Sequence, residues 1–261
     1  MNKILYLIAL VLTLSSCAKS YNVKGVSSVS ALDGSKLYLK AVKNGEMKTI
    51  DSCDVVHGEF HFTGLLDTIC MASLYMDDES IMPLVLEEGN IVIKIGDATQ
   101  GVSGTPMNDS LYHFIDRHSQ LSNSMTELTH RQSQMLLDGI DEDTIDEQLS
   151  AEAAQIAKEE DQLVTGFIVR NFDNVLGPGI FMMVTSQYRY PMLTPQIEDI
   201  MSKATAKFKN DPYVRDYYQT AQENEARMNG LSDTAESQPA PAPQPAPLPK
   251  PAAPLTNVPQ P

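Results

Sequence analysis

The chain has 261 residues, with 19 lysines and arginines against 34 aspartates and glutamates, which gives a formal net charge of −15. A chain this acidic is repelled by phosphate-rich surfaces, so the composition argues against binding to nucleic acid and against docking on anionic lipid through a basic patch. The length is sufficient for one large domain or two small ones.

The first 16 residues have the pattern of a secretory signal peptide, in which Lys3 precedes an apolar run over residues 4–14. That run is too short for a membrane span, which needs about 20 residues. It ends in Leu14-Ser15-Ser16-Cys17, which resembles the lipobox of bacterial lipoproteins. The resemblance implies cleavage before Cys17 and a lipid on its thiol, followed by a lipidated tether over residues 17–24. The alternative is an ordinary signal peptide with an unrelated cysteine.

The residue after the lipobox cysteine bears on location. It is Ala18 rather than aspartate, which by the same resemblance favours sorting to the outer membrane of a double-membraned cell. We therefore expect a cell-envelope protein that is attached to a membrane through the lipid on Cys17.

Residues 25–104 have the spacing of short strands separated by glycines. Residues 37–41 alternate between apolar and polar side chains, and the runs 50–56 and 60–63 flank His57-Gly58, which is typical of a two-residue hairpin turn. In that register one face carries Cys53, Val55, Phe60 and Phe62, and the other carries Asp54 and His61.

Two later segments extend this β pattern. Residues 69–76 read as a strand, and Glu87-Glu88-Gly89-Asn90 reads as a turn before a strand whose inward face carries Ile91, Ile93 and Ile95. Strands this short predict a small antiparallel β-sandwich or an open barrel. With the helices expected after it, the fold class is α+β.

Several short motifs occur in a fixed order along this β module. They are Leu32-Asp33-Gly34, Leu37-Tyr38-Leu39, Ile50-Asp51-Ser52, the run from Gly58 to Gly64, the run from Leu86 to Ile91, and Gly104-Thr105 with Asn108, Leu111 and Phe114. Together they resemble domain of unknown function 4369, a module that often precedes thioredoxin-like domains in envelope-anchored proteins. The chain has no tryptophan, so the Trp-Cys-x-x-Cys motif of those domains is absent and their reductase activity is not implied.

Residues 105–230 form the expected helical module. Thr105-Pro106 is a favourable helix start, because threonine can cap the helix and proline suits its first position. Gly177-Pro178-Gly179 reads as a break between helices. The expected helices cover residues 105–138, 143–172, 180–188, 194–207 and 211–230.

Residues 231–261 are rich in proline and alanine and are expected to be a disordered tail. Proline fixes its own φ and favours extended geometry, so the run from 238 to 261 would reach on the order of 70 Å as polyproline II. Such a tail is either a spacer or docking strip for an unknown protein partner, or a terminal segment without a partner.

Two cysteines remain once Cys17 is assigned to the lipid. An oxidising compartment permits a disulfide between Cys53 and Cys70, which would stabilise the fold by roughly 3 kcal/mol. The alternative is two buried free thiols on strands. No Cys-x-x-Cys occurs in the sequence, so thioredoxin-type redox chemistry has no motif to support it.

No pattern in the sequence predicts a catalytic, cofactor or metal site. The acidic runs 77–79 and 141–143 lack the spacing of a calcium loop, and Tyr188 and Tyr190 fit either a groove between the modules or packing at its rim. There is no nucleophile elbow, phosphate loop or dinucleotide fingerprint. The spacing of the histidines does not match that of a zinc site. They are His57, His61, His113, His118 and His130.

These observations support two hypotheses. The first is a non-catalytic, lipid-anchored envelope protein that acts as a binding or scaffold module for a protein or small ligand. The alternative is an accessory or degenerate member of a periplasmic thiol-disulfide system that has lost its thioredoxin-like domain. An enzyme of unrecognised type is a weaker third reading.

Overall fold

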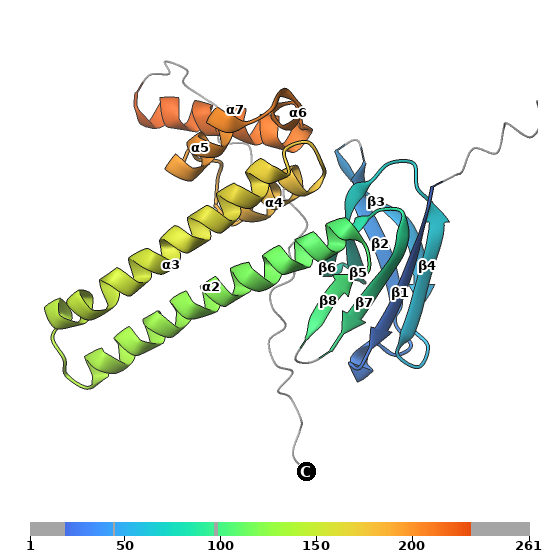
Figure 1. Cartoon of the computed structure of the whole chain (residues 1–261), viewed down its shortest axis with the longest axis horizontal. Helices are drawn as coiled ribbons and strands as arrows, with labels where there is room; N and C mark the ends of the chain where they lie inside the picture. Colours follow the sequence, from blue (N-terminus) through green and yellow to red (C-terminus); the bar gives the residue numbers. More distant parts are fainter. Residues whose placement is uncertain (1–18, 44, 97–98, 231–261) are drawn as a thin grey trace, which may run out of the picture.

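The computed structural model describes residues 19–43, 45–96 and 99–230 (Figure 1). The expected signal peptide, the lipidation residue Cys17 and the expected tail over 231–261 lie outside the described residues. Within them the chain forms two four-stranded sheets followed by helices, which confirms the α+β class and the order of its two parts.

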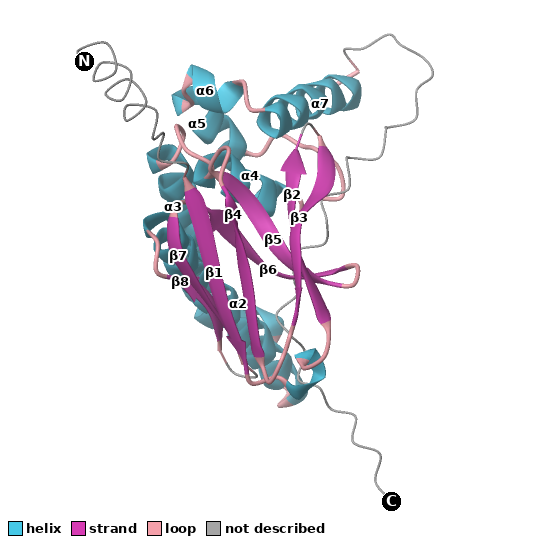
Figure 2. Cartoon of the chain, turned by 90° about the vertical axis from the view of Figure 1, so that its right-hand side faces the viewer, coloured by secondary structure: helices cyan, strands magenta, loops and turns pink. Residues whose placement is uncertain are grey.

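The two sheets form a β-sandwich whose strands are interleaved along the chain (Figure 2). The first sheet has the order β4-β1-β7-β8 and the second has the order β3-β2-β5-β6. All neighbouring strands are antiparallel except β1 and β7, which are parallel. The strands are β1 (Ser20–Ser27), β2 (Lys36–Lys43), β3 (Glu46–Asp54), β4 (Glu59–Leu65), β5 (Cys70–Met76), β6 (Glu79–Leu86), β7 (Gly89–Ile95) and β8 (Gln100–Ser103), with a 3-10 turn η1 (Ser30–Leu32) after β1.

Strand β1 corrects the expected tether, because residues 20–24 lie inside this strand at the centre of the first sheet. Its inward face is hard to read from sequence, since Gly25 stands where an apolar side chain would be expected. Phe60 of β4 lies directly opposite, and a Cβ added to Gly25 would fall 2.0 Å from its ring. Tyr21 covers Gly64 in the reverse arrangement. Cross-strand aromatic rings thus fill the space left by both glycines.

The predicted turn at His57-Gly58 is confirmed, since both residues have positive φ, 53° and 74°, as a two-residue type I′ turn requires. The flanking strands, however, do not continue as a paired hairpin. Only Val56 and Glu59 form a bridge, after which β3 and β4 enter different sheets. The predicted facing is also confirmed: Val55, Phe60 and Phe62 are buried, Cys53 packs against the core, and Asp54 and His61 are exposed.

The helices begin close to where the capping residues predict. They are α2 (Pro106–Leu137), α3 (Glu142–Arg170), α4 (Leu176–Thr185), α5 (Pro195–Lys203), α6 (Ala206–Lys209) and α7 (Pro212–Met228). The side chains of Thr194 and Asp211 accept hydrogen bonds from the first-turn backbone of α5 and α7. The helix expected over 194–207 is divided, because Thr205 caps a separate short helix, α6.

The break expected at Gly177-Pro178-Gly179 is wrong, because all three residues lie in α4. Pro178 occupies the first turn, where backbone N–H groups have no partner within the helix, so its missing N–H costs no helical hydrogen bond. The glycines permit close packing instead. A Cβ on Gly177 would fall 2.4 Å from the carbonyl oxygen of Asn171, and one on Gly179 would fall 2.9 Å from Met71 of β5.

Helix α2 crosses the side of the sandwich where the edge strands β6 and β8 lie. The hydroxyl of Tyr112 on α2 donates a hydrogen bond to the carbonyl oxygen of Pro83 at 2.9 Å. Burial raises the pKa of that hydroxyl well above its usual range, so it remains a donor. Strand β6 is therefore covered on its outer face as well, which explains its continuous apolar run.

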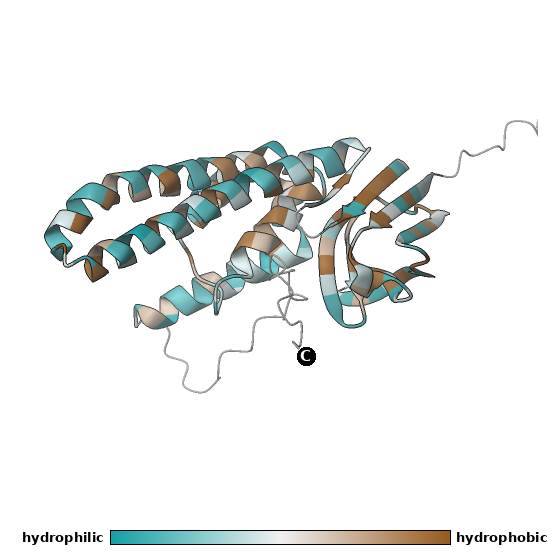
Figure 3. Cartoon of the chain, turned by 90° about the horizontal axis from the view of Figure 1, so that it is seen from below, coloured by the Kyte–Doolittle hydropathy of each residue, from teal (hydrophilic) through white to brown (hydrophobic). Residues whose placement is uncertain are grey.

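Helices α2 and α3 run antiparallel and project from the body of the molecule as a long hairpin, which we call the arm (Figure 1). Its 32-residue first helix is about 48 Å long. Figure 3 shows that the arm is mainly hydrophilic along its length, with apolar residues near its free end. A small apolar cluster formed by Leu128, Ile145 and Leu149 holds this end together, separately from the main core.

Candidate functional site

The two described cysteines lie far apart. Leu37 of β2 pairs with Cys53 on one side and with Met76 of β5 on the other. Cys70 lies six residues before Met76 along β5. Six strand residues span about 20 Å, and cysteine Cα atoms more than about 7 Å apart cannot be bridged without backbone movement. Both thiols are free, so the disulfide considered from the sequence is not formed. Burial raises the pKa of each thiol, which lowers its reactive thiolate fraction.

The five histidines are spread over the β3–β4 turn (His57), strand β4 (His61) and the length of helix α2 (His113, His118 and His130). His61 shares a hydrogen bond with Asn22, whose amide donates to Asn90 at 2.6 Å, so the three form a polar row across the outer face of the first sheet. His118 stacks on Phe114 and faces Glu160 at 3.2 Å across the arm. In the described part of the chain no three His, Cys, Asp or Glu residues are grouped as metal ligands.

The most enclosed polar cluster joins α2 to the sandwich. We call it the joint; its members are Glu87, Thr105 and Asn108, and all three are buried. The carboxylate of Glu87 accepts hydrogen bonds from the backbone N–H groups of Met107 and Asn108, at 2.8 and 3.1 Å. A carboxylate is favourable at a helix N-terminus. Glu87 therefore caps α2 in place of Thr105, whose own side chain does not cap it.

Asn108 completes the joint on the side of the second sheet. Its side-chain oxygen accepts from the backbone N–H of Val85 and its amide donates to the Val85 carbonyl, both at 2.8 Å. A side-chain amide thus occupies the place of a neighbouring strand at the β6 edge. The amide also donates to the Thr105 hydroxyl at 2.8 Å. Every member has a partner within the protein, so the joint is structural and sets the direction of α2.

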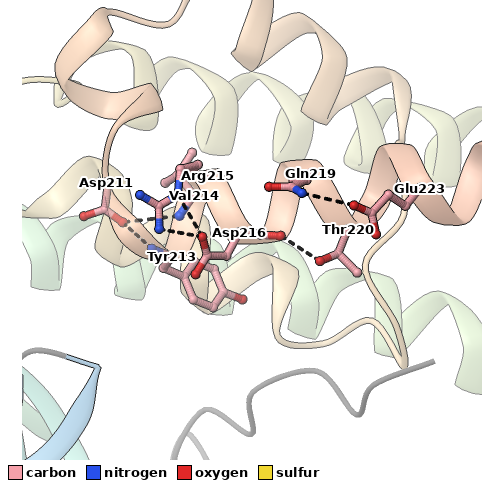
Figure 4. A network of polar contacts seen from close by, with 8 residues as sticks. All are labelled: Asp211, Tyr213, Val214, Arg215, Asp216, Gln219, Thr220 and Glu223. Carbon is pink, nitrogen blue, oxygen red and sulfur yellow. Dashed lines mark hydrogen bonds and ion pairs between the residues drawn. The ribbon is translucent and has the colours of Figure 1, made fainter. Parts of the chain in front are cut away.

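A shallow hollow beside α7 is the next candidate, and its polar groups bond locally (Figure 4). Asp211 accepts from the backbone N–H groups of Tyr213 and Val214, and Gln219 donates to Glu223 at 3.1 Å, one helical turn away. These contacts lie within α7 and stabilise that helix. The hollow is lined by Met201, Lys209, Arg215, Tyr218, Gln219 and Gln222.

Tyr188 and Tyr190, which the sequence offered as groove residues, lie in different surroundings. Tyr188 is half-buried and packs against the main core, whereas Tyr190 is exposed. Nearby, the hydroxyl of Tyr217 lies 3.2 Å from both the N–H and the carbonyl oxygen of Met192. Burial raises the pKa of Tyr217 to about 12, so its hydroxyl stays protonated and fastens this loop to α7. These residues support rim packing.

At the free end of the arm, three large apolar side chains are exposed together on a tightly built turn. Leu136, Leu137 and Ile140 form this surface, which we call the tip; the side chain of Leu137 is 88% exposed. Gly139 has φ +79°, and the N–H groups of Gly139 and Ile140 bond to the carbonyls of Leu136 and Met135. This is a Schellman motif, which ends α2 abruptly. Sequence reasoning identified the break but not its exposed leucines.

Helix α3, which follows the tip, is capped at its start by Asp141. The carboxylate of Asp141 accepts from the backbone N–H and the hydroxyl of Thr144, both at 2.9 Å, and these bonds lower the pKa of Asp141. Acidic side chains surround the tip, and residues 138–147 contain no lysine or arginine. The acidic run 141–143 thus forms the start of α3. In the run 77–79, Asp77 and Asp78 form the turn between β5 and β6, and Glu79 is the first residue of β6.

Among the described helices, none combines the length and the apolar character needed to cross a bilayer. No curated protein matches the sequence. The match to a family model covers residues 21–111, which are the β-sandwich and the first turns of α2, joint included. This part of the chain is similar to the family described as domain of unknown function (DUF4369).

Proposed function

We propose that the protein is a non-catalytic, lipid-anchored binding protein of the cell envelope, which presents the tip of its arm to a protein partner. The observation that carries this proposal is the exposure of Leu136, Leu137 and Ile140 together at the end of the arm. Solvent-exposed apolar side chains that are grouped and rimmed by polar residues are characteristic of interaction sites.

The construction of the tip favours binding. The Schellman motif and the Asp141 cap fix the turn before any partner arrives, so little conformational entropy is lost on association. Burial of one leucine or isoleucine side chain contributes about 1.5–3 kcal/mol. The acidic surroundings specify the partner further: it carries an apolar pocket with lysine or arginine at its rim.

A photo-crosslinking amino acid at position 137 tests this proposal in cells. We expect a discrete adduct with one envelope protein, and none from the same label at Glu127, an exposed position midway along the arm. Replacing Leu136 and Ile140 by serine should reduce the adduct at least about tenfold, since each lost side chain removes about 1.5 kcal/mol or more. Equal labelling from positions 127 and 137 would contradict a binding tip.

Charge provides the second test. Asp146 and Glu147 are exposed near the tip, and the double change Asp146→Asn and Glu147→Gln should slow adduct formation most at low salt. Mass spectrometry of the adduct should place the crosslink beside basic residues of the partner. A chain ending at Gly230 measures the contribution of the proline-rich segment, which we propose as a spacer rather than the binding site; loss of the adduct would reverse this assignment.

Lipid attachment is tested separately by the mass of the N-terminal peptide. We expect a mature protein that begins at an acylated Cys17, and a Cys17→Ser variant that is released from the membrane fraction. An outer-membrane location is expected from Ala18 and is read from fractionation of the two membranes.

The alternative, an accessory role in a thiol-disulfide system, rests on the family match alone. The separation of Cys53 from Cys70 and the raised pKa of both thiols give it no structural support. It predicts that the tip crosslinks to a thioredoxin-like protein, so the same experiment distinguishes the two proposals.

A further inference from the structure

The link between the proposed lipid and the folded domain is very short. The backbone carbonyl of Lys19 already accepts a hydrogen bond from Leu66 at 2.8 Å, and β1 begins at Ser20. Only Ala18 stands between Cys17 and Lys19, and two extended residue steps reach at most about 7 Å. A lipidated Cys17, which is part of the proposed function, would therefore hold this end of the sandwich against the membrane surface.

Exposed apolar residues gather at the same end, which we call the membrane end. Leu65 pairs with Ser20 across the first sheet and is 74% exposed. Val42 and Met47 form a cross-strand pair of exposed side chains at the end of β2 and the start of β3. Leu65 shares a shallow groove with Lys43 and Lys48, so the two sheets contribute to one surface.

The charge of the membrane end differs from that of the whole chain. Lys43 lies 3.7 Å from Asp67, and Lys48 lies 3.7 Å from Glu46, so these charges balance locally in a chain of net charge −15. Anionic head groups therefore do not repel this surface as they would repel the acidic arm. The long lysine side chains can also keep their amines at head-group level while their stems contact lipid.

We propose that the membrane end rests directly on the lipid surface, with the Leu65 side chain placed among the head groups, and that the protein is mounted on its sandwich rather than suspended from a flexible tether. The inference rests on the proposed lipid at Cys17. Its consequence is directional: the arm extends away from the side at which the chain enters β1, so the tip is held off the membrane (Figure 1, Figure 3).

The absence of tryptophan from the chain allows a clean test with a single introduced indole. The variants are Leu65→Trp at the membrane end, Val56→Trp at the opposite end of the sandwich, and Leu137→Trp at the tip, all at exposed positions. Each full-length acylated protein is reconstituted in vesicles of phosphatidylethanolamine and phosphatidylglycerol, with bromine on a share of the acyl chains. We expect loss of fluorescence and a blue-shifted emission at position 65 only.

The outcomes separate the inference from the lipid anchor itself. Protein that floats with the vesicles but shows no quenching at position 65, 56 or 137 would overturn direct contact and leave the anchor intact. Equal quenching at all three positions would overturn the proposed orientation. Protein that lacks the acyl mass on Cys17 and does not float would overturn the anchor, and the inference with it.

Discussion

The β-sandwich and the distal half of the arm are built in different ways. The sandwich encloses large side chains from both sheets, including Phe62, Leu39 and Ile93, with almost no exposure. The distal arm has only a three-residue buried cluster, supplemented by exposed ion pairs such as Arg131–Glu152 at 2.9 Å. Surface ion pairs contribute little, about 0–1 kcal/mol each. The comparison indicates that the main core, which the sandwich shares with the adjoining helices, carries most of the buried apolar surface, whereas the distal arm has a small core and exposed apolar side chains at its tip.

The largest effect is expected from emptying the sandwich core. Phe62→Ala should lower the free energy of unfolding by about 3–5 kcal/mol, because it removes a fully buried ring and leaves a cavity. Denaturant unfolding followed by circular dichroism measures it. Leu65→Ala on the same strand is the control and should change stability by less than about 0.5 kcal/mol, as its side chain is mostly exposed. Similar losses for both variants would contradict the assignment of the core.

The next largest effect is expected at the joint. Asn108→Ala leaves the N–H and carbonyl of Val85 without their side-chain partner, and an unsatisfied buried group costs about 1–3 kcal/mol. We expect a loss of about 3 kcal/mol in total, together with weakened protection of α2 amides against hydrogen exchange. Glu88→Gln, an exposed change beside the joint, should leave both measurements unchanged.

Leu128→Ala tests whether the arm unfolds independently of the sandwich. This change removes one of three buried residues from the distal cluster and should destabilise the arm by about 2 kcal/mol. If the two regions are independent, amide exchange near the tip accelerates while β-sheet amides keep their protection. Equal acceleration in the sheets would show that arm and sandwich unfold as one unit.

The smallest effect is expected from pH at the tip. The pKa of Asp141 is lowered in the folded protein because Thr144 donates two hydrogen bonds to its carboxylate. Its contribution is therefore present above the ordinary aspartate pKa and is lost as the pH falls through the lowered value. The Thr144 amide resonance should report this loss in acid, and Asp141→Asn should remove it. Asp143→Asn, which leaves the cap in place, should behave like the unchanged protein.

Local signals were sufficient to predict the features that depend on neighbouring residues. His57-Gly58 predicts its turn because both positions tolerate positive φ there, and glycine does so without strain. Thr194-Pro195 and Asp211-Pro212 predict helix starts because capping side chains bond within one turn. The isoleucines of β7 predict their inward face because alternation on a strand requires no knowledge of its partners.

Other features depended on residues distant in sequence. Strand β1 lacks a complete alternating apolar pattern because Phe60 fills the space above Gly25. The separation of β3 and β4 into two sheets follows from their pairings with β2 and β1, and the turn that joins them does not determine it. The sequence predicts Glu87 as a turn residue, and its role as the cap of α2 is evident only when the helix is packed beside it. The sequence by itself determined the order of strands and helices, the turn and most helix starts, because those are set by short-range sterics and hydrogen bonds. Only the tertiary structure decided which strands share a sheet, where the arm points and which leucines remain exposed, because these depend on which distant surfaces exclude water together.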